Sequence, residues 1–243
     1  MKYPFFLGIY LVILYNHFMK LDPFLSLANE FEKQGFRLWL TGGTARDYLL
    51  NRNFQEFDCA TDALPSQMLT FLYDANDRFA HYGHLSLYHL DSKFDITTLR
   101  TEGHYEDARH PGQLTFIKDP KQDVTRRDFT INALYVDKQF HVDDFVEGLK
   151  DLHDKVIRMI GEPNQRLQED PLRIIRAIRF KVMLGFAYEP SLLQAMKDNL
   201  GFLQRLNEQK VIQEVKKIPF IDRSLGREEL YSFGLMKLGD MLS

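Results

Sequence analysis

The chain has 243 residues, of which 44% are apolar and 27% are charged, so it can bury a core as one large domain or two small ones. Its formal net charge of −3 excludes a uniformly basic protein, and a nucleic-acid partner therefore needs a local basic face. The single cysteine, Cys59, excludes an internal disulfide, fits a reducing compartment and is expected to be free and buried. The histidines and this cysteine do not follow the spacing of a zinc site.

The N-terminal segment from Tyr3 to Phe18 is almost entirely apolar. It lacks the small-residue cleavage site of a signal peptide, and it is shorter than the roughly 20 residues that a membrane-spanning helix needs. We interpret residues 1–18 as an extension ahead of a functional start at Met19. A membrane anchor is the alternative.

Hydrophobic periodicity and turn residues predict the secondary structure. In chain order, the first elements are a helix at 22–34, a strand at 36–41, a helix at 44–50, a strand at 56–60, a helix at 66–73 opened by Pro65, and strands at 85–90 and 94–99. The next are a polar, mobile loop at 100–112, a strand at 114–117, a helix near 120–134 and a hairpin around 135–143. From residue 144 onward the chain is predicted to be helical, with helices at 145–152, 163–184, 190–204, 208–217 and 226–240.

The most informative motif is a glycine turn followed by two carboxylates. Gly42 and Gly43 come directly after a predicted strand, where paired glycines let backbone N–H groups approach a phosphate. Glu56 and Asp58 stand one residue apart on the next strand, so both side chains point to one face. Two carboxylates beside a phosphate site favour Mg²⁺-dependent phosphoryl transfer. The alternative is a turn followed by a solvated acidic strand end.

A third carboxylate lies on a later strand. Asp95 stands between Phe94 and Ile96, so its side chain points away from theirs. If this strand neighbours strand 56–60, Asp95 joins the other two carboxylates. The alternative is an ordinary exposed aspartate.

Two arginine-rich motifs follow. Arg126 and Arg127 precede Asp128 and an apolar run, and guanidinium groups bind phosphate oxygens bidentately. The alternative for this segment is a surface turn with salt bridges.

The second motif begins at Asp170 and Pro171, where the proline suits the first turn of a helix. Arg173 lies at the same end as Asp170, and such a carboxylate and guanidinium can read the edge of a base without a template. Further arginines recur every three residues, and residues 173–217 are locally basic, as contact with an RNA backbone requires. The alternative is a helix cap followed by solvated basic side chains.

These motifs, in this order, resemble the tRNA nucleotidyltransferases (CCA-adding enzymes) and the related bacterial poly(A) polymerases of the polymerase-beta-like nucleotidyltransferase superfamily. The resemblance runs from about Met19 to Leu206, and the pieces that carry it are residues 42–47, 56–63, 94–100, 126–133 and 169–176. It implies an α+β fold. A nucleotidyltransferase head with a mixed sheet and flanking helices would cover 19–143, an all-α neck with nucleotide-reading and RNA-binding residues 144–217, and a short helical remnant of the body 218–243.

The resemblance also implies residue roles. Glu56 and Asp58 would hold Mg²⁺, with Asp95 as the third catalytic carboxylate. The nucleotide-binding residues would be Gly43, Arg46, Arg127, Asp170, Arg173, Arg176 and Arg179. Among these, Gly43 and Arg46 would contact the triphosphate, and Asp170 and Arg173 would read the base. Residues 100–111 match the family's flexible loop through Arg100, Asp107 and Arg109, and the presence of this loop favours competence to add the adenosine.

The sequence departs from the family pattern at two of the carboxylates. Glu56 replaces the usual aspartate, and Asp95 is shorter than the glutamate often found at its position. The chain also ends at Ser243, where family members usually continue through helical domains that hold the tRNA elbow. We therefore expect the short C-terminus to weaken tRNA binding more than turnover, and a minihelix with only the acceptor stem and T arm to be used about as well as full-length tRNA.

The implied function is template-independent addition of CCA, from CTP and ATP, to the 3′ end of tRNA, with release of pyrophosphate. A poly(A) polymerase or a partial CC- or A-adding enzyme is the alternative on the same fold. An inactive RNA-binding relic is the alternative from another class. The implied location is the cytoplasm, or an organellar matrix if residues 1–18 are a targeting segment, and no stable membrane association is expected.

Overall fold

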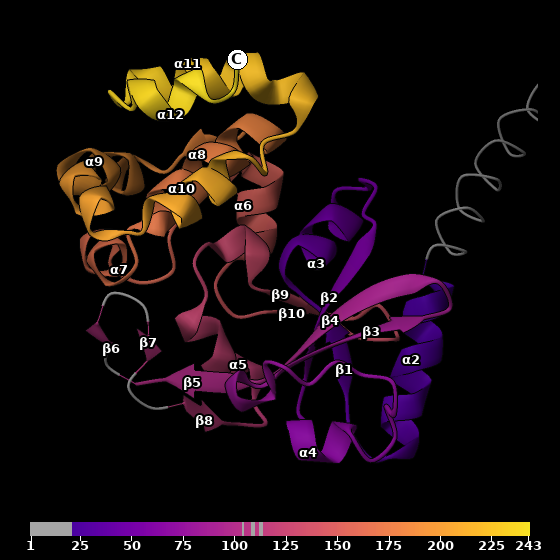
Figure 1. The fold of residues 1–243 in the computed structure, drawn as a ribbon. Coiled ribbons are helices and arrows are strands. Elements are labelled where there is room, and N and C mark those ends of the chain that lie inside the picture. Colours follow the sequence, from indigo (N-terminus) through magenta and orange to yellow (C-terminus); the bar gives the residue numbers. More distant parts are fainter. Residues whose placement is uncertain (1–20, 104, 108–109, 112–113) are drawn as a thin grey trace, which may run out of the picture. The chain divides into compact units, whose positions relative to one another are not determined.

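The computed structural model describes residues 21–103, 105–107, 110–111 and 114–243 (Figure 1). The predictions about residues 1–18 and about Arg109 lie outside this part of the chain. The chain divides into two compact units. Of the described residues, the first contains 21–99, 116–119 and 135–143, and the second contains those between 100 and 115 together with 120–134 and 144–243.

The first unit is built on a six-stranded mixed sheet, which confirms the predicted fold class. The strand order is β10-β9-β1-β2-β4-β3. In chain order the strands are β1 (Leu38–Leu40), β2 (Glu56–Thr61), β3 (His84–His89), β4 (Ser92–Thr98), β9 (Leu134–Val136) and β10 (Val142–Asp144). β2 and β4 are parallel, whereas β1 with β2 and β3 with β4 are antiparallel.

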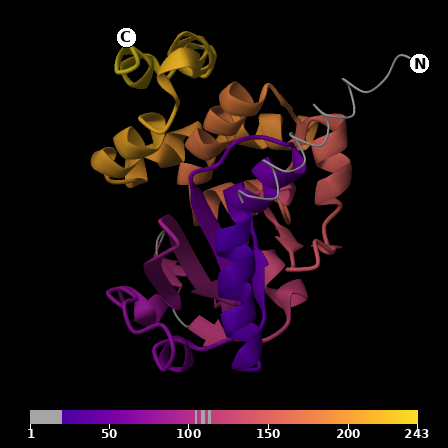
Figure 2. The same cartoon turned by 90° about the vertical axis from the view of Figure 1, so that its right-hand side faces the viewer.

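One face of this sheet is apolar because side chains alternate along its strands. The buried residues of β2, β4 and β3 on this face are Phe57, Cys59, Phe94, Ile96, Leu85 and Leu87. Helix α2 (Asp22–Lys33) covers the face with Phe24, Leu27 and Phe31, and in both views it lies against the sheet (Figures 1 and 2). The prediction of a free, buried Cys59 is confirmed. The opposite face of β2, β4 and β3 is left for polar side chains.

Two further helices are described in this unit. The helix predicted at 44–50 begins two residues earlier than expected, and the helix predicted at 66–73 ends early. α3 (Gly42–Leu49) starts at the paired glycines. α4 (Pro65–Met68) starts at Pro65, but the prediction of a helix as far as residue 73 is wrong. The Thr70 hydroxyl donates to the Gln67 carbonyl, and the amides of Thr70 and Phe71 bond three residues back, so the chain leaves the α-helix after one turn.

Two predictions between residues 100 and 134 are also wrong in part. The predicted loop contains β5 (Arg100–Glu102), β6 (Tyr105–Asp107) and β7 (His110–Pro111), because β5 pairs with β8 (Leu114–Phe116) and β6 with β7. The predicted helix near 120–134 is instead α5 (Pro120–Asp123) and two short 3₁₀ turns, η2 (Val124–Arg126) and η3 (Thr130–Asn132).

The helix predicted near 120–134 is interrupted by long-range backbone hydrogen bonds on both sides of Phe129. The Asp128 carbonyl accepts from the Ile160 amide, and the Thr130 amide donates to the Arg158 carbonyl. A backbone group paired across the fold is no longer available to a helix.

The second unit is mainly helical, as predicted. From residue 144 onward its helices are α6 (Gly148–Asp154), α7 (Pro163–Glu169), α8 (Leu172–Leu184), α9 (Pro190–Asn199), α10 (Glu208–Val215), α11 (Arg223–Ser232) and α12 (Met236–Asp240), with η4 (Leu200–Arg205) and η5 (Phe220–Asp222) between them. A short parallel pair, β11 (Val156–Ile157) with β12 (Ala187–Tyr188), was not predicted, because two residues show no alternation. Figure 1 shows α8 beside α10 and α11 beside α12.

Two long predicted helices are each divided. The prediction at 163–184 breaks at Asp170, which has φ −142° and ψ 92°, because the residue before a proline is forced out of the helical region. The prediction at 226–240 breaks at Gly234, whose φ of 73° ends the helix in a left-handed turn. Neither division moves an apolar face out of the core, and Ile174, Ile175 and Ile178 of α8 are fully buried.

No helix among the described residues is long and apolar enough to span a bilayer.

Candidate active site

The glycine turn and the first strand of the motif are locked together. Gly42 has a φ of 58°, which favours glycine, and a Cβ on Gly42 or Gly43 would lie 3.2 or 3.3 Å from Asp58 Oδ2. The Gly43 amide donates to that same oxygen at 3.2 Å. Thr44 Oγ1 accepts from the Asp58 amide at 2.8 Å and donates to the Glu56 carbonyl at 3.0 Å. The G-G-T sequence therefore fixes the strand that carries both carboxylates.

The three predicted carboxylates lie on one face of the sheet. Asp58 pairs in register with Asp95 across β2 and β4. The strand of Asp95 therefore neighbours the strand of Glu56 and Asp58, which was the condition for Asp95 to join the other two carboxylates. Glu56 pairs with Lys93 one step earlier in the same ladder. Residues in register share a face, so Glu56, Asp58 and Asp95 line the polar side of the sheet, opposite α2.

Two basic side chains that the sequence interpretation missed hold this cluster. Lys93 Nζ lies 3.1 Å from Glu56 Oε2 and 3.0 Å from Asp95 Oδ2, and these contacts raise the pKa of Lys93. His84 Nε2 lies 3.4 Å from Asp95 Oδ1, and the bonds from His84 and then Lys93 lower the pKa of Asp95 below its usual value. The signal for Lys93 was present in the sequence, because it stands two residues before Asp95 and shares its face.

Arg46 reaches the glycine turn from the first helix. Its side chain is buried and binds Asp47 through two hydrogen bonds of 2.9 Å. Its guanidinium nitrogen lies 3.6 Å from the position that a Cβ on Gly43 would take. The structure therefore brings together Gly43 and Arg46, which the family resemblance assigns to the triphosphate.

Glu56 and Asp58 fit one of the ways in which proteins bind Mg²⁺. No group of three or more His, Cys, Asp or Glu side chains in the described ranges is arranged to hold a metal by itself. Mg²⁺ is usually held by one or two carboxylates together with substrate phosphates, and not by an all-protein cage. Two carboxylates beside the Gly43 amide would be the protein's share of such a site.

In the second unit, Arg127 belongs to a hub around Asp123, which the sequence interpretation also missed. Asp123 is fully buried, and its carboxylate binds Arg127 at 2.9 Å and Arg126 at 2.7 Å. It also accepts the backbone amide of Arg100 at 2.9 Å. The i to i+4 spacing of Asp123 and Arg127 was the available signal. Through this hub, the start of β5 is fixed to the arginine motif.

Asp170 and Arg173 lie together where α7 meets α8. Arg173 is buried, its Nη1 donates to the Arg166 carbonyl at 2.9 Å, and its Nε lies 3.9 Å from Asp170 Oδ2. Asp170 Oδ1 accepts the Leu172 amide at 3.1 Å. Arg166 in turn donates to the carbonyls of Arg126 and Arg127 at 3.0 Å each. The predicted base-reading pair is thus rigidly supported by an arginine that the sequence interpretation did not select.

The next two arginines of α8 have separate buried partners. Arg176 lies 2.6 Å from Asp128, and although burial by itself raises the pKa of Asp128, Arg176 and the Phe129 amide bring that pKa below its usual value. Arg179 lies 2.7 Å from Glu214 of α10, and Arg179 and Lys217 likewise outweigh burial and lower the pKa of Glu214. Both arginines therefore also hold the fold of the second unit.

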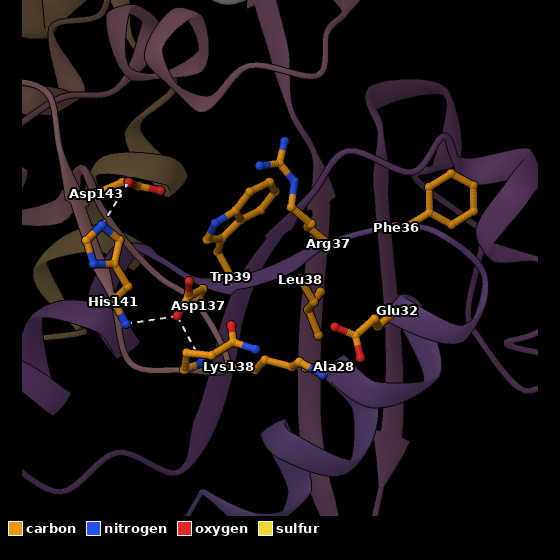
Figure 3. Close-up of a pocket in the computed structure, with 11 residues that line it drawn as sticks. Ala28, Glu32, Phe36, Arg37, Leu38, Trp39, Asp137, Lys138, His141 and Asp143 are labelled. Atoms are coloured by element: carbon orange, nitrogen blue, oxygen red, sulfur yellow. Dashed lines mark hydrogen bonds and ion pairs between the residues drawn. The ribbon is translucent and has the colours of Figure 1, made fainter.

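Of the loop residues assigned by resemblance, Arg100 starts β5 and Asp107 ends β6. A cavity of about 360 Å³ lies elsewhere in the first unit, between α2, β1 and the β9–β10 hairpin (Figure 3). Two pairs of its charged residues bind one another, Lys138 with Glu32 and His141 with Asp143, and the cavity contains none of the predicted site residues.

Comparison with known proteins assigns these motifs to a family. Residues 38–158 match the family described as the poly(A) polymerase head domain. The CCA-adding enzyme of Staphylococcus haemolyticus is 33% identical over 192 residues, which cover 79% of this chain and 48% of that enzyme. That of Lactobacillus johnsonii is 36% identical over 194 residues, covering 80% and 49%.

The chain belongs to the family of tRNA nucleotidyltransferases and bacterial poly(A) polymerases. It spans about half the length of the curated relatives it matches. Nucleotidyltransferases of this polymerase-beta type generally use a divalent metal.

Solved structures agree with the family assignment. The Bacillus stearothermophilus CCA-adding enzyme in complex with CTP matches with a TM-score of 0.79 and 29% identity, over 88% of this chain and 52% of that one. The Thermotoga maritima CCA-adding enzyme complexed with tRNA matches with a TM-score of 0.68 and 25% identity, over 90% and 52%. The fold of this nucleotidyltransferase family member is therefore that of CCA-adding enzymes.

Proposed function

We propose that this chain is a tRNA nucleotidyltransferase that adds CCA, from CTP and ATP, to the 3′ end of tRNA. The 3′-hydroxyl of the RNA attacks the α-phosphate, and pyrophosphate leaves. The observation that carries the proposal is the carboxylate pair of β2, with Asp58 fixed against the glycine turn. The names of the curated relatives, and the CTP and tRNA complexes among the solved structures, support the choice of substrates.

In the first unit, Glu56 and Asp58 would hold Mg²⁺, which when bound lowers the pKa of the attacking hydroxyl and stabilises developing charge. The Gly43 amide and the Arg46 guanidinium would bind triphosphate oxygens. Because Thr44 ties α3 to β2, the phosphate donors and the carboxylates keep a fixed separation. Positioning of this kind accounts for most of the catalysis in phosphoryl transfer.

In the second unit, Asp170 and Arg173 would read the base, since a carboxylate accepts from an exocyclic amine and a guanidinium donates to ring acceptors. The Arg166 carbonyl fixes the Arg173 side chain, and a fixed donor discriminates between bases better than a mobile one. The remaining arginines would bind the nucleotide or support its binding site, and each is held in place by an ion pair with a carboxylate of the second unit. These arginines are Arg127, Arg176 and Arg179. We assign the reaction to the cytoplasm.

The test is extension of a tRNA transcript that lacks CCA, with CTP alone, ATP alone and both nucleotides, followed by sequencing of the 3′ ends. We expect two cytidines from CTP alone and CCA from the mixture, each dependent on Mg²⁺ and absent in Asp58→Ala. A long adenosine tail from ATP alone would identify a poly(A) polymerase, and a product that stops at CC would identify a partial enzyme. RNA binding without any metal-dependent incorporation would identify an inactive relic.

A further inference from the structure

The polar face of the sheet continues beyond the carboxylates to β3. Glu56, Lys93 and Tyr88 form one row across β2, β4 and β3, and Asp58, Asp95 and Ser86 form the next. Within the described strands of this sheet, β3 is the outermost on this side. The row that begins at the predicted metal ligand Glu56 therefore ends at Tyr88, at the edge of the sheet.

Tyr88 is an exposed aromatic side chain on a strand whose other face is buried. It is 75% exposed, whereas Leu85 and Leu87 on the opposite face of β3 are buried. A sheet residue gains stability by packing, and an exposed ring of this size offers about 150 Å² or more of apolar surface for a ligand. Tyr88 thus presents a flat ring beside the catalytic face without serving the core.

The surroundings of Tyr88 suit a nucleic acid. Lys93 is the partner of Tyr88 across β3 and β4. His84 lies four residues before Tyr88 on β3, with its side chain on the same face. The Phe79 ring, 48% exposed, lies 6.4 Å from the His84 ring and continues the aromatic surface. Exposed rings with basic side chains between them are the chemistry by which proteins bind single strands, through base stacking and phosphate contacts.

The spacing also suits the last nucleotide of an RNA. Neighbouring strands lie about 4.8 Å apart, so Tyr88 stands roughly 10 Å from Glu56 across β4. An RNA whose 3′-hydroxyl lies over Glu56 and Asp58 can place its terminal base over β3. The backbone position of Tyr88 is fixed, because β3 and β4 are joined directly by Leu90 and Asp91, and His89 pairs with Ser92.

We propose that Tyr88 stacks on the 3′-terminal base of the RNA that is extended, with Lys93 and His84 facing the sugar and phosphate of that nucleotide. The proposal rests on the proposed function for the identity of the RNA. Stacking on a ring does not depend on which base is present, and this suits an enzyme whose primer end changes after every addition.

The test compares Tyr88→Ala and Tyr88→Phe with Tyr73→Ala, which removes another tyrosine that is 85% exposed but lies outside β3. The first measurement is binding of an acceptor-stem minihelix with a 3′-terminal 2-aminopurine, in EDTA and without nucleotides. We expect the 2-aminopurine emission to be quenched by the wild type, Tyr88→Phe and Tyr73→Ala, but not by Tyr88→Ala. We also expect Tyr88→Ala to weaken binding about tenfold.

The second measurement is steady-state incorporation by the same variants. Tyr88→Ala should raise the KM for RNA about tenfold and leave the KM for CTP unchanged. Equal quenching and equal RNA affinity in Tyr88→Ala and Tyr73→Ala would overturn the proposal. A wild type that quenches the probe but incorporates no nucleotide would overturn the proposed function and leave the stacking intact, so the two failures are distinguishable.

Discussion

The two units hold their candidate site residues in different ways. In the first unit, Glu56, Asp58 and Asp95 lie on a half-open sheet face, positioned by strand alternation and by a glycine turn. In the second, Arg176 and Arg179 each form an ion pair with a buried carboxylate. We expect side chains of the first kind to be changeable with little effect on the fold, whereas a change to those of the second kind should also weaken the fold.

The sharpest test of this difference is Asp58→Ala. We expect it to reduce incorporation by about a thousandfold or more, because metal stabilisation of the transition state is worth several kcal/mol. The midpoint of thermal unfolding should fall only slightly, since the side chain faces the polar side of the sheet and its loss removes one hydrogen bond, from the Gly43 amide. Single-turnover incorporation and a thermal melt measure the two quantities. Glu56→Asp is the matched control and should retain activity, because it restores the carboxylate usual in the family.

In the second unit the largest effect should be on stability. Asp128→Ala removes a buried carboxylate paired with Arg176, and loss of one partner of a buried pair costs about 3 kcal/mol. Urea unfolding measures this loss. Asp154→Ala, which removes the partner of the exposed Lys150, should leave the free energy of unfolding unchanged. Equal stability of the two variants would show that the Asp128–Arg176 pair does not hold the fold.

The same pair predicts a dependence on pH. The folded pKa of Asp128 is lowered relative to the unfolded chain, so its contribution is fully present above the ordinary aspartate pKa of about 3.9 and is lost as the pH falls through the lower, folded value. The wild type should therefore lose stability below about pH 4. In Asp128→Asn this portion of the loss should be absent. Unfolding curves recorded between pH 7 and pH 3, at intervals of about one pH unit, would measure the difference in stability between the wild type and Asp128→Asn.

Arg173→Ala should act on selectivity more than on rate. A good contact to a base edge is worth about 1–3 kcal/mol of discrimination, so incorporation of UTP relative to CTP should rise by about tenfold or more. Competition between labelled CTP and UTP measures the ratio. An equal fall for all four nucleotides would assign Arg173 to the phosphates or to the fold.

The smallest expected effect concerns the turn of the β3–β4 hairpin, which carries Tyr88 on β3. Leu90 has a φ of 47° and Asp91 a φ of 59°, and the left-handed region costs a residue with a side chain roughly 1–2 kcal/mol. Leu90→Gly should therefore raise the free energy of unfolding by about 1 kcal/mol. Leu225→Gly is the control, because Leu225 is also exposed but lies inside α11, where glycine should lower stability by about as much. Chemical denaturation compares the two.

The sequence by itself determined the polar face of the six-stranded sheet. Alternation is local, so Glu56 and Asp58 had to share a face, and Asp95 had to point away from Phe94 and Ile96. The paired glycines predicted that the backbone closely approaches another group, and in the structure that group is the Asp58 side chain. The helical character of the chain from residue 144 onward was also predictable from its apolar periodicity, although not every helix boundary was.

Only the tertiary structure decided which charged groups are partners. Asp123 and Arg127 bind each other and are only four residues apart in the sequence. Arg179, in contrast, binds Glu214, which lies 35 residues away on another helix, and no local sequence pattern connects those two residues. The breaks within the predicted helix at 120–134 have the same origin, because the backbone of Asp128 and Thr130 pairs with Ile160 and Arg158. Periodicity records how a segment faces the core. The partner of a buried charge depends on which distant segment the completed fold places beside it.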